Sequence, residues 1–350
     1  MIARPLPVPA PPERVLIVKP SALGDVVTAV PVLRGLRRTF PDARISWLLS
    51  DACAPILAHD ADLDETIPFP RRQLGPWWRS PSAARLLREF LRTLRRGAFD
   101  WVIDLQGLFR SGLFARVTGA RVRAGFADAR EGAWAFYTHR VRPEERHTVD
   151  RNLALASSLG VDARREDMTL SPSPAAREFA EGLRGRIDPA GGGFLAFVPP
   201  TRWETKSYPP RRWRTVAAAF AGRMPVALLG TRSDRALCER VAKGAAGNVV
   251  NLAGETTIPQ MVALIASAAC VVCSDSAAQF IAQAVGVPVV TLMGPTRPER
   301  TGPILRGQAV VADVPCQGCL RRRCRHITCM QTLAPETVVS AIEKALNGHP

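Results

Sequence analysis

The stretch Arg14-Val-Leu-Ile-Val-Lys-Pro-Ser-Ala-Leu-Gly-Asp25 decides the fold, because an apolar run leads through a turn into a helical pattern that reaches about Thr39. A continuous apolar run of this length is typical of a strand buried on both faces of a parallel sheet. In open sheets of this kind ligands bind beyond the carboxyl ends of the strands, so we expect the turn at Gly24 to lie at a functional edge. The turn matches neither the G-x-G-x-x-G dinucleotide fingerprint nor a P-loop.

Strand-like runs alternate with helical patterns over the rest of the chain. In the first half they cover 45–49 and 101–104, and the alternation lapses between Ser171 and Gly193. A second series of apolar runs follows at 194–198, 226–229, 249–252, 271–274 and 287–292. This alternation predicts an α/β protein with two doubly wound domains, each a parallel sheet covered by helices. The expected parts are an N-terminal domain, a linker, a C-terminal domain and a final helix, at 1–175, 176–193, 194–334 and 335–350.

The chain of 350 residues is strongly basic, with 47 Lys and Arg against 31 Asp and Glu and a net charge of +16. The excess is almost all arginine and predicts an anionic partner, which could be nucleic acid, a membrane surface or an acidic substrate. No apolar run reaches the roughly 18–20 residues that cross a bilayer. Met1 to Arg14 lacks the apolar core of a signal peptide, which predicts a cytoplasmic protein.

The opening stretch resembles the N-terminal motif of glycosyltransferase family 9, the bacterial lipopolysaccharide heptosyltransferases. Later segments resemble further motifs of the family in the same order, at 102–111, 147–151, 197–201, 274–280 and 286–296. The resemblance runs from Arg14 to about Leu346. It implies the GT-B architecture, in which two Rossmann-like domains face a central cleft and the last helix crosses back to the first domain.

The resemblance also implies two catalytic residues. Asp25 would be the base that removes a proton from an acceptor hydroxyl, although its position alone favours a carboxylate that stabilises the first turn of a helix. Lys206 would be the second, because it would stabilise the charge that the donor diphosphate gains as the sugar bond breaks, and Thr201 would contact the same diphosphate. A solvated loop lysine is the alternative interpretation of Lys206.

Further donor contacts follow from the same resemblance. Asp234 would bind the nucleoside ribose, or else cap a helix. The segment Ser274-Asp-Ser-Ala-Ala-Gln-Phe280 precedes a helix whose backbone amides could cradle a phosphate. Its expected donor contacts are Asp275, Ser276 and Ala277.

Two positions of this segment depart from the family pattern. The family usually has glycine at position 277 and histidine at position 280, where this chain has Ala277 and Phe280. These changes restrict how closely a phosphate can approach and remove a hydrogen-bond donor. A donor other than ADP-heptose therefore stays an alternative.

The acceptor is expected on the first domain. The resemblance implies that Ser21, Asp104 and Gln106 lie at the edge of the cleft, and that Arg71 and Arg72 bind the anionic lipopolysaccharide core. These two arginines are the first residues of the segment 71–96, which contains eight arginines and one glutamate.

The arginine-rich segment has a second interpretation as an ordinary amphipathic helix with a basic outer face. Its surface, together with Trp77 and Trp78, could also rest on the anionic inner leaflet of the cytoplasmic membrane.

A cysteine cluster follows the second series of strands. The spacing Cys316-x2-Cys319-x4-Cys324-x4-Cys329 could hold zinc through four thiolates. A second C-x-x-C pair is missing, so redox-labile or buried thiols are the favoured interpretation. We predict no metal and no cofactor.

Taken with the resemblance, these patterns predict an inverting, metal-independent transfer of heptose from ADP-heptose to the lipid A-linked inner core of lipopolysaccharide. One alternative is a family 9 transferase that uses another nucleotide sugar. Another is a non-catalytic nucleotide-sugar-binding protein of the same fold. A nucleic-acid binder is disfavoured, because the sequence has no recognised binding module.

Overall fold

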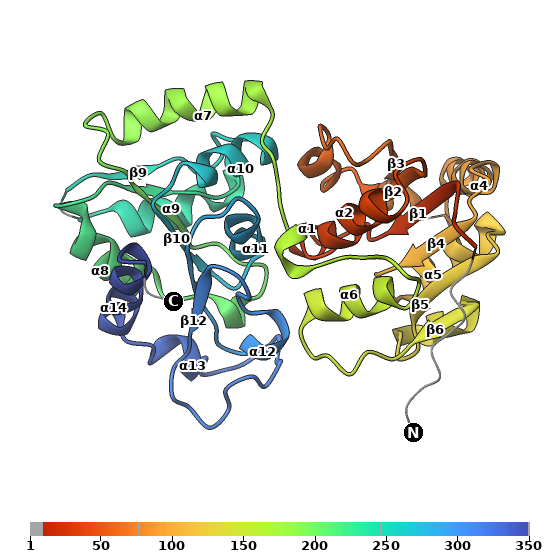
Figure 1. The fold of residues 1–350 in the computed structure, drawn as a ribbon. Helices are drawn as coiled ribbons and strands as arrows, with labels where there is room; N and C mark the ends of the chain where they lie inside the picture. Colours follow the sequence, from red (N-terminus) through yellow and green to blue (C-terminus); the bar gives the residue numbers. More distant parts are fainter. Residues whose placement is uncertain (1–9, 76, 246, 349–350) are drawn as a thin grey trace. The chain divides into compact units, whose positions relative to one another are not determined.

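The computed structural model describes residues 10–75, 77–245 and 247–348, and the chain divides into two compact units, Met1–Met168 and Thr169–Pro350. Each unit is built on its own six-stranded parallel sheet with helices on both faces (Figure 1). The α/β class with two doubly wound units, predicted from the sequence, is confirmed.

The first sheet has the strand order β3-β2-β1-β4-β5-β6. Its strands are β1 (Arg14–Val18), β2 (Arg44–Ser50), β3 (Glu65–Phe69), β4 (Trp101–Asp104), β5 (Val122–Phe126) and β6 (His139–Val141). The direction of strand addition reverses between β1 and β4, where Val18 lies beside Asp104 in the parallel register. In doubly wound sheets the crevice at such a reversal is the usual ligand site. The turns that follow β1 and β4 are therefore neighbours at a functional edge.

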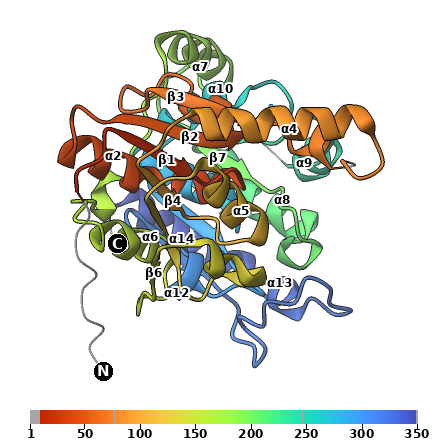
Figure 2. The ribbon, with the colours of Figure 1, turned by 90° about the vertical axis from the view of Figure 1, so that its right-hand side faces the viewer.

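Helices cover both faces of the first sheet (Figures 1 and 2). The helices on one face are α2 (Val30–Thr39) and α6 (Thr148–Ser157), and those on the other are α4 (Pro81–Arg96) and α5 (Phe109–Thr118). Phe69 of β3, Phe90 of α4 and Phe114 of α5 pack with ring centroids 5.0 to 5.7 Å apart. Aromatic pairs of this geometry add to the free energy of apolar burial, so they fix α4 and α5 on the sheet. The remaining short elements are α1 (Leu23–Val27), α3 (Arg71–Leu74), η1 (Ala54–Leu57), η2 (Arg130–Phe136) and η3 (Arg165–Asp167).

The helix α4 is amphipathic, as the sequence predicts. Its N-cap Ser80 accepts a hydrogen bond from the Ala83 amide at 3.3 Å. Phe90 and Leu94 are buried against the unit. The exposed positions carry Glu89 and five arginines, which are Arg85, Arg88, Arg92, Arg95 and Arg96.

The second sheet has the order β12-β11-β10-β7-β8-β9, which is the topology of the first sheet. Its strands are β7 (Leu195–Val198), β8 (Val226–Leu228), β9 (Val249–Asn251), β10 (Cys270–Ser274), β11 (Val289–Leu292) and β12 (Gly307–Val310). The reversal lies between β7 and β10, where Val198 is paired with Cys273. The turns after β7 and β10 therefore meet at the functional edge of the second unit.

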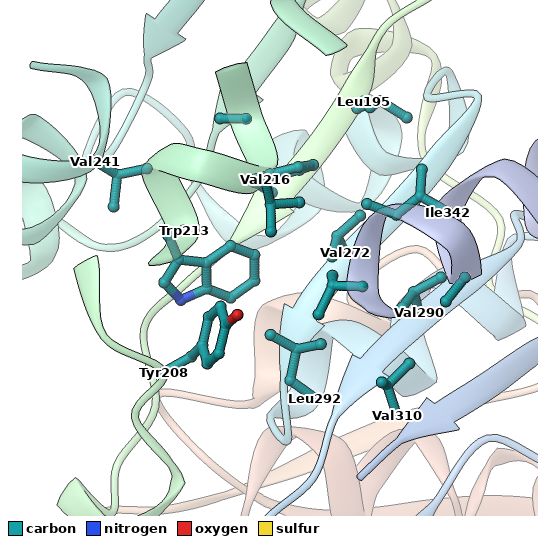
Figure 3. Close-up of a cluster of buried hydrophobic side chains, with 14 of the residues drawn as sticks. Leu195, Tyr208, Trp213, Val216, Val241, Val272, Val290, Leu292, Val310 and Ile342 are labelled. Carbon is teal, nitrogen blue, oxygen red and sulfur yellow. The ribbon is translucent and has the colours of Figure 1, made fainter. Parts of the chain in front are cut away.

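The core of the second unit joins its sheet to helices from distant parts of the chain (Figure 3). Trp213 and Tyr208 pack edge to face with centroids 5.6 Å apart, close to Val272 and Leu292. Fully burying side chains of this size stabilises the unit by roughly 1.5–3 kcal/mol each. The helices and 3-10 turns are α7 (Pro174–Ile187), η4 (Glu204–Lys206), α8 (Pro210–Ala221), η5 (Arg232–Asp234), α9 (Arg235–Ala242), α10 (Ile258–Ala266), α11 (Ala277–Ala284), α12 (Pro298–Thr301), α13 (Thr328–Gln331) and α14 (Pro335–Leu346).

The division of the chain differs from the predicted one in two places. The boundary falls after Met168, and most of the expected linker is α7, which packs against α10 and belongs to the second unit. The final helix α14 also belongs to the second unit, because Val338 and Ile342 are fully buried in that core. Figure 3 shows Ile342 among the core side chains. This helix was expected to cross back to the first domain. Both α7 and α14 have an apolar face that must be buried, and each buries it against the second unit.

Candidate functional site

The turn after β1 presents Asp25 as the third residue of α1. Its Oδ2 atom accepts a hydrogen bond from the Ala22 amide at 3.0 Å, which caps the helix. The side chain is only partly buried, and Oδ1 has no hydrogen bond among the described residues. One oxygen thus has a structural role, while the other can accept a proton.

Two neighbours of Asp25 occupy different environments. The Lys19 side chain is buried, and its Nζ donates to the Leu105 carbonyl oxygen at 2.7 Å, which joins the ends of β1 and β4. Ser21 is half-buried in the turn. Ser21 therefore stays a candidate contact, whereas Lys19 stabilises the edge of the sheet.

The structure does not place Asp104 where it could bind an acceptor. Its side chain is 0% exposed, and Oδ1 accepts hydrogen bonds from the amides of Gln106 and Gly107 at 2.9 and 3.1 Å. Its Oδ2 accepts from the Tyr137 hydroxyl at 2.7 Å. Burial raises the pKa of the Asp104 carboxyl, while these hydrogen bonds act to lower it. The expectation of an acceptor contact was wrong here, because this carboxylate instead stabilises the turn after β4.

The other expected acceptor residues are partly or fully exposed. Gln106 is half-buried, and its Oε1 is a buried atom without a hydrogen-bond partner in the described part of the chain. Arg71 and Arg72 are exposed on α3. Beyond them, Trp77 and Trp78 are 50% and 63% exposed. None of the described helices is long and apolar enough to cross a membrane.

The turns after β7 and β10 interlock at the reversal of the second sheet. Ser274 donates its hydroxyl hydrogen bond to the Pro199 carbonyl oxygen at 2.9 Å. Thr201 donates to the backbone oxygen of Asp275 at 3.4 Å. The sequence places these residues far apart, and the parallel register of β7 and β10 brings them together.

Asp275 is the centre of this second site. It is buried, and its Oδ2 forms an ion pair with Lys206 Nζ at 2.8 Å and accepts a hydrogen bond from Thr296 Oγ1. Its Oδ1 accepts from Gln279 Nε2 at 2.9 Å. Lys206 keeps 15% of its side chain exposed, and its Nζ lies 4.5 Å from the centroid of the Trp203 ring. Asp275 therefore positions Lys206, whose side chain stays partly exposed.

The start of α11 contains polar atoms without partners. Ser276 is its N-cap, and the buried Ser276 Oγ has no hydrogen-bond partner among the residues described here. The same holds for Oε1 of Gln279, whose side chain is 0% exposed. An unsatisfied buried polar atom costs about 1–3 kcal/mol, which water or a ligand can offset.

The two departures from the family pattern have different consequences in the structure. Ala277 is the first residue of α11 and has no positive φ, so its side chain does not strain the backbone. Phe280 is buried in the unit. The alanine is thus compatible with the backbone at the start of α11, while position 280 adds no polar group to this turn.

Asp234 lies beyond the end of β8, which is the strand next to β7 in the second sheet. Its Oδ2 accepts hydrogen bonds from the amide and the hydroxyl of Thr231, at 2.8 and 2.5 Å. It therefore caps the turn, as the alternative interpretation predicts, and its side chain is partly accessible. A ribose contact through the other oxygen stays a prediction.

Three residues of this site were missed by sequence reasoning. Thr296 ends a segment that resembles a family motif, yet only the folded chain brings it to Asp275. Gln279 follows the expected donor residues in the sequence, and nothing in the local pattern indicates that its side chain contacts Asp275. Trp203 lies between Thr201 and Lys206, but no local pattern marks its ring as a platform for cations.

The four clustered cysteines are close enough to influence one another. Burial raises the pKa of the Cys329 thiol, and Cys316, Cys319 and Cys324 raise it further. Cys316 and Cys319 are exposed. Within the described ranges, no group of three or more His, Cys, Asp or Glu side chains has the arrangement of a metal site.

A parallel α/β unit with a lysine and unpartnered polar groups at its reversal point has the design of a nucleotide-binding domain. Two units of this topology in one chain define the class of two-domain nucleotide-dependent α/β proteins. Within that class the chain belongs to glycosyltransferase family 9 (heptosyltransferase), whose model matches residues 87–329. It is therefore a glycosyltransferase.

Known proteins agree with this assignment. Lipopolysaccharide heptosyltransferase 1 of Pseudomonas aeruginosa is 30% identical over 325 residues, which cover 89% of this chain and 88% of the relative. The structure of Escherichia coli heptosyltransferase WaaC with ADP-2-deoxy-2-fluoro heptose superposes with a TM-score of 0.75 at 25% identity, over 95% of this chain and 99% of that one. A family 9 glycosyltransferase from Veillonella parvula has a TM-score of 0.80 at 19% identity, over 96% of this chain and 97% of that one, and supports the fold.

Proposed function

We propose that this protein transfers heptose from ADP-heptose to the inner core of lipid A-linked lipopolysaccharide, with inversion at the anomeric carbon. The observation that carries the proposal is the ammonium of Lys206, which is held by Asp275 and Trp203, while the residue after Asp275, Ser276, has a buried hydroxyl without a partner among the described residues. The relatives in Pseudomonas aeruginosa and Escherichia coli are named as heptosyltransferases, which supports the choice of sugar.

The donor would be bound by the second unit. Lys206 and the start of α11 would contact the diphosphate, with Thr201, Ser276 and Ala277 as neighbours. Negative charge grows on the diphosphate as the bond from the anomeric carbon to its oxygen breaks, and a preorganised cation stabilises that charge. Asp234 would bind the ribose hydroxyls.

The acceptor would be activated by the first unit. Asp25 would take the proton of the acceptor hydroxyl while the hydroxyl oxygen bonds to the anomeric carbon and ADP departs with the electron pair. The free Oδ1 of this partly exposed carboxylate supports the role. Ser21 and Gln106 would orient the acceptor, and no metal enters these steps.

The basic surface of the first unit fits an anionic acceptor at a membrane. Arg71 and Arg72 are exposed, and their guanidinium groups suit phosphates and carboxylates of the lipopolysaccharide core. The exposed rings of Trp77 and Trp78 would rest in the interface of the inner leaflet, beside the arginine face of α4. The protein would act in the cytoplasm as a peripheral enzyme.

The test is a transfer assay with a panel of donors. The purified protein is incubated with a lipid A-linked core acceptor and with ADP-heptose, a UDP-sugar or a GDP-sugar. Mass spectrometry measures the added sugar, and NMR assigns the anomeric configuration of the product. Inverted transfer from ADP-heptose alone is expected.

Each other outcome has a definite meaning. Transfer from only a UDP- or GDP-sugar would favour the family 9 alternative with another donor. Nucleotide binding without transfer to any acceptor would favour a non-catalytic binding protein. Retention of configuration would contradict the single displacement.

A further inference from the structure

The segment between β12 and α13 carries both the cysteine cluster and a run of arginines. We call residues 311–327 the basic loop, since it contains Arg321, Arg322, Arg323 and Arg325. All four arginines are exposed. The loop has no regular secondary structure, so its position depends on contacts with the rest of the second unit.

Hydrogen bonds hold the basic loop on the segment that follows β11. The Leu320 amide donates to the Pro295 carbonyl oxygen at 2.7 Å, and Arg297 Nε donates to the Gly318 carbonyl oxygen at 3.0 Å. The side-chain amide of Gln317 donates to the backbone oxygen of Thr296 at 3.3 Å. Thr296 is itself a hydrogen-bond partner of Asp275, so the loop is anchored on a residue of the donor site.

Arg322 extends from this anchored loop to Trp203. Its Cζ lies 4.7 Å from the centroid of the Trp203 ring, and Lys206 Nζ lies 4.5 Å from the same centroid. Both distances are within the range of cation–π attraction. The two cations share one ring and are at most about 9 Å apart.

The charges of these two cations are balanced differently. Lys206 is paired with Asp275 at 2.8 Å. Arg322 forms no ion pair with any described residue, and the ring is its one recorded partner. An anion that reaches both side chains would supply the counter-charge that Arg322 lacks among the described residues.

We propose that Arg322 is a second diphosphate-binding residue of the donor site, with Trp203 as the platform that holds it beside Lys206. The proposal rests on the proposed function of this site, and its ligand is the diphosphate of a nucleotide sugar. Arginine supplies a planar fork of donors for phosphate oxygens, whereas lysine supplies a point charge. The two residues thus stabilise the same leaving group in different ways.

The test compares nucleotides that differ in phosphate number. Calorimetry measures the dissociation constants of ADP, AMP and adenosine for the wild-type protein and for Arg322→Gln. The expected loss for ADP is about 10- to 100-fold, the equivalent of lost hydrogen bonds to a charged group. Binding of adenosine should stay within about twofold, since it has no phosphate to lose contact with.

The matched control is Arg321→Ala, which removes the same charge from the neighbouring exposed position. It should weaken ADP binding by no more than about threefold, because screened surface charges act weakly at a distance. Equal losses in the two variants, or an equal loss for ADP and adenosine in Arg322→Gln, would overturn the proposal.

A double-mutant cycle tests the platform. If Trp203 holds Arg322, the two substitutions are coupled. The dissociation constant of ADP should then rise in the double variant Trp203→Leu/Arg322→Gln by a smaller factor than the product of the factors measured for the two single variants. A loss equal to that product would overturn the role of Trp203. A wild-type protein that binds no ADP would instead reject the proposed function itself, which separates the two failures.

Discussion

Replacing Asp25 should separate a helix cap from a catalytic base, because the two roles use different chemistry of one carboxylate. Its Oδ2 accepts a hydrogen bond from the Ala22 amide at 3.0 Å. In Asp25→Asn the amide oxygen can still accept that bond, but the side chain can no longer take a proton. In Asp25→Ala both properties are lost.

The expected magnitudes follow from these contacts. Loss of an N-terminal cap costs about 1 kcal/mol, which lowers the melting temperature of a unit of this size by roughly 2–4 °C. Only Asp25→Ala should show that change. Loss of a general base should lower kcat by roughly 10²- to 10⁴-fold, or about 2.7–5.4 kcal/mol in activation free energy, in both variants.

Two assays on the same protein preparations give the answer. Differential scanning calorimetry measures the melting temperature, and ADP release in the presence of acceptor measures kcat. An Asp25→Asn enzyme with wild-type turnover would refute the base and leave the cap as the only role of this residue. A melting temperature unchanged in Asp25→Ala would refute the cap.

Two other features of the first unit lead to predictions. Tyr137→Phe removes the hydroxyl that donates to buried Asp104 at 2.7 Å and should cost about 1–3 kcal/mol, because it leaves a buried acceptor without its partner. Burial raises the pKa of the Asp104 carboxyl, while the Tyr137 hydrogen bond acts to lower it and so stabilises the charged form more than the neutral form. The loss measured by urea unfolding should therefore be smaller at about pH 4 than at about pH 8, and equal losses at both pH values would argue against this pair. Replacing Trp77 and Trp78 together by serine should weaken sedimentation with vesicles of anionic phospholipid by about tenfold or more, while neutral vesicles serve as the control; unchanged sedimentation would exclude these rings from the membrane contact.

Much of the fold follows from local patterns. The apolar run at β1 and its turn are visible in the sequence because a strand buried on both faces needs consecutive apolar residues. Strands without such runs were missed. β3 contains Pro68, β5 contains Arg123 and Gly125, and β6 has only three residues. Their pairing depends on a neighbouring strand rather than on their own composition.

The candidate site divides in the same way. Position after a strand, taken with the resemblance to the family, selected Asp25, Lys206, Asp275 and Ser276, whose roles in the reaction stay predictions. It was not enough for Asp104, which satisfies every criterion of position but is enclosed by backbone amides and Tyr137. Whether a polar side chain after a strand faces a ligand or its own turn depends on the space around it.

The sequence by itself therefore determined the doubly wound architecture, the order of its turns and the family to which the motifs point, because these depend on periodicity and on residues close together in the chain. The tertiary structure alone decided which helices belong to which unit, which carboxylates are enclosed, and that Arg322 and Lys206 share the ring of Trp203. The physical reason is that burial and electrostatic interaction depend on distances in space, and segments far apart in the sequence come together only when the sheet assembles.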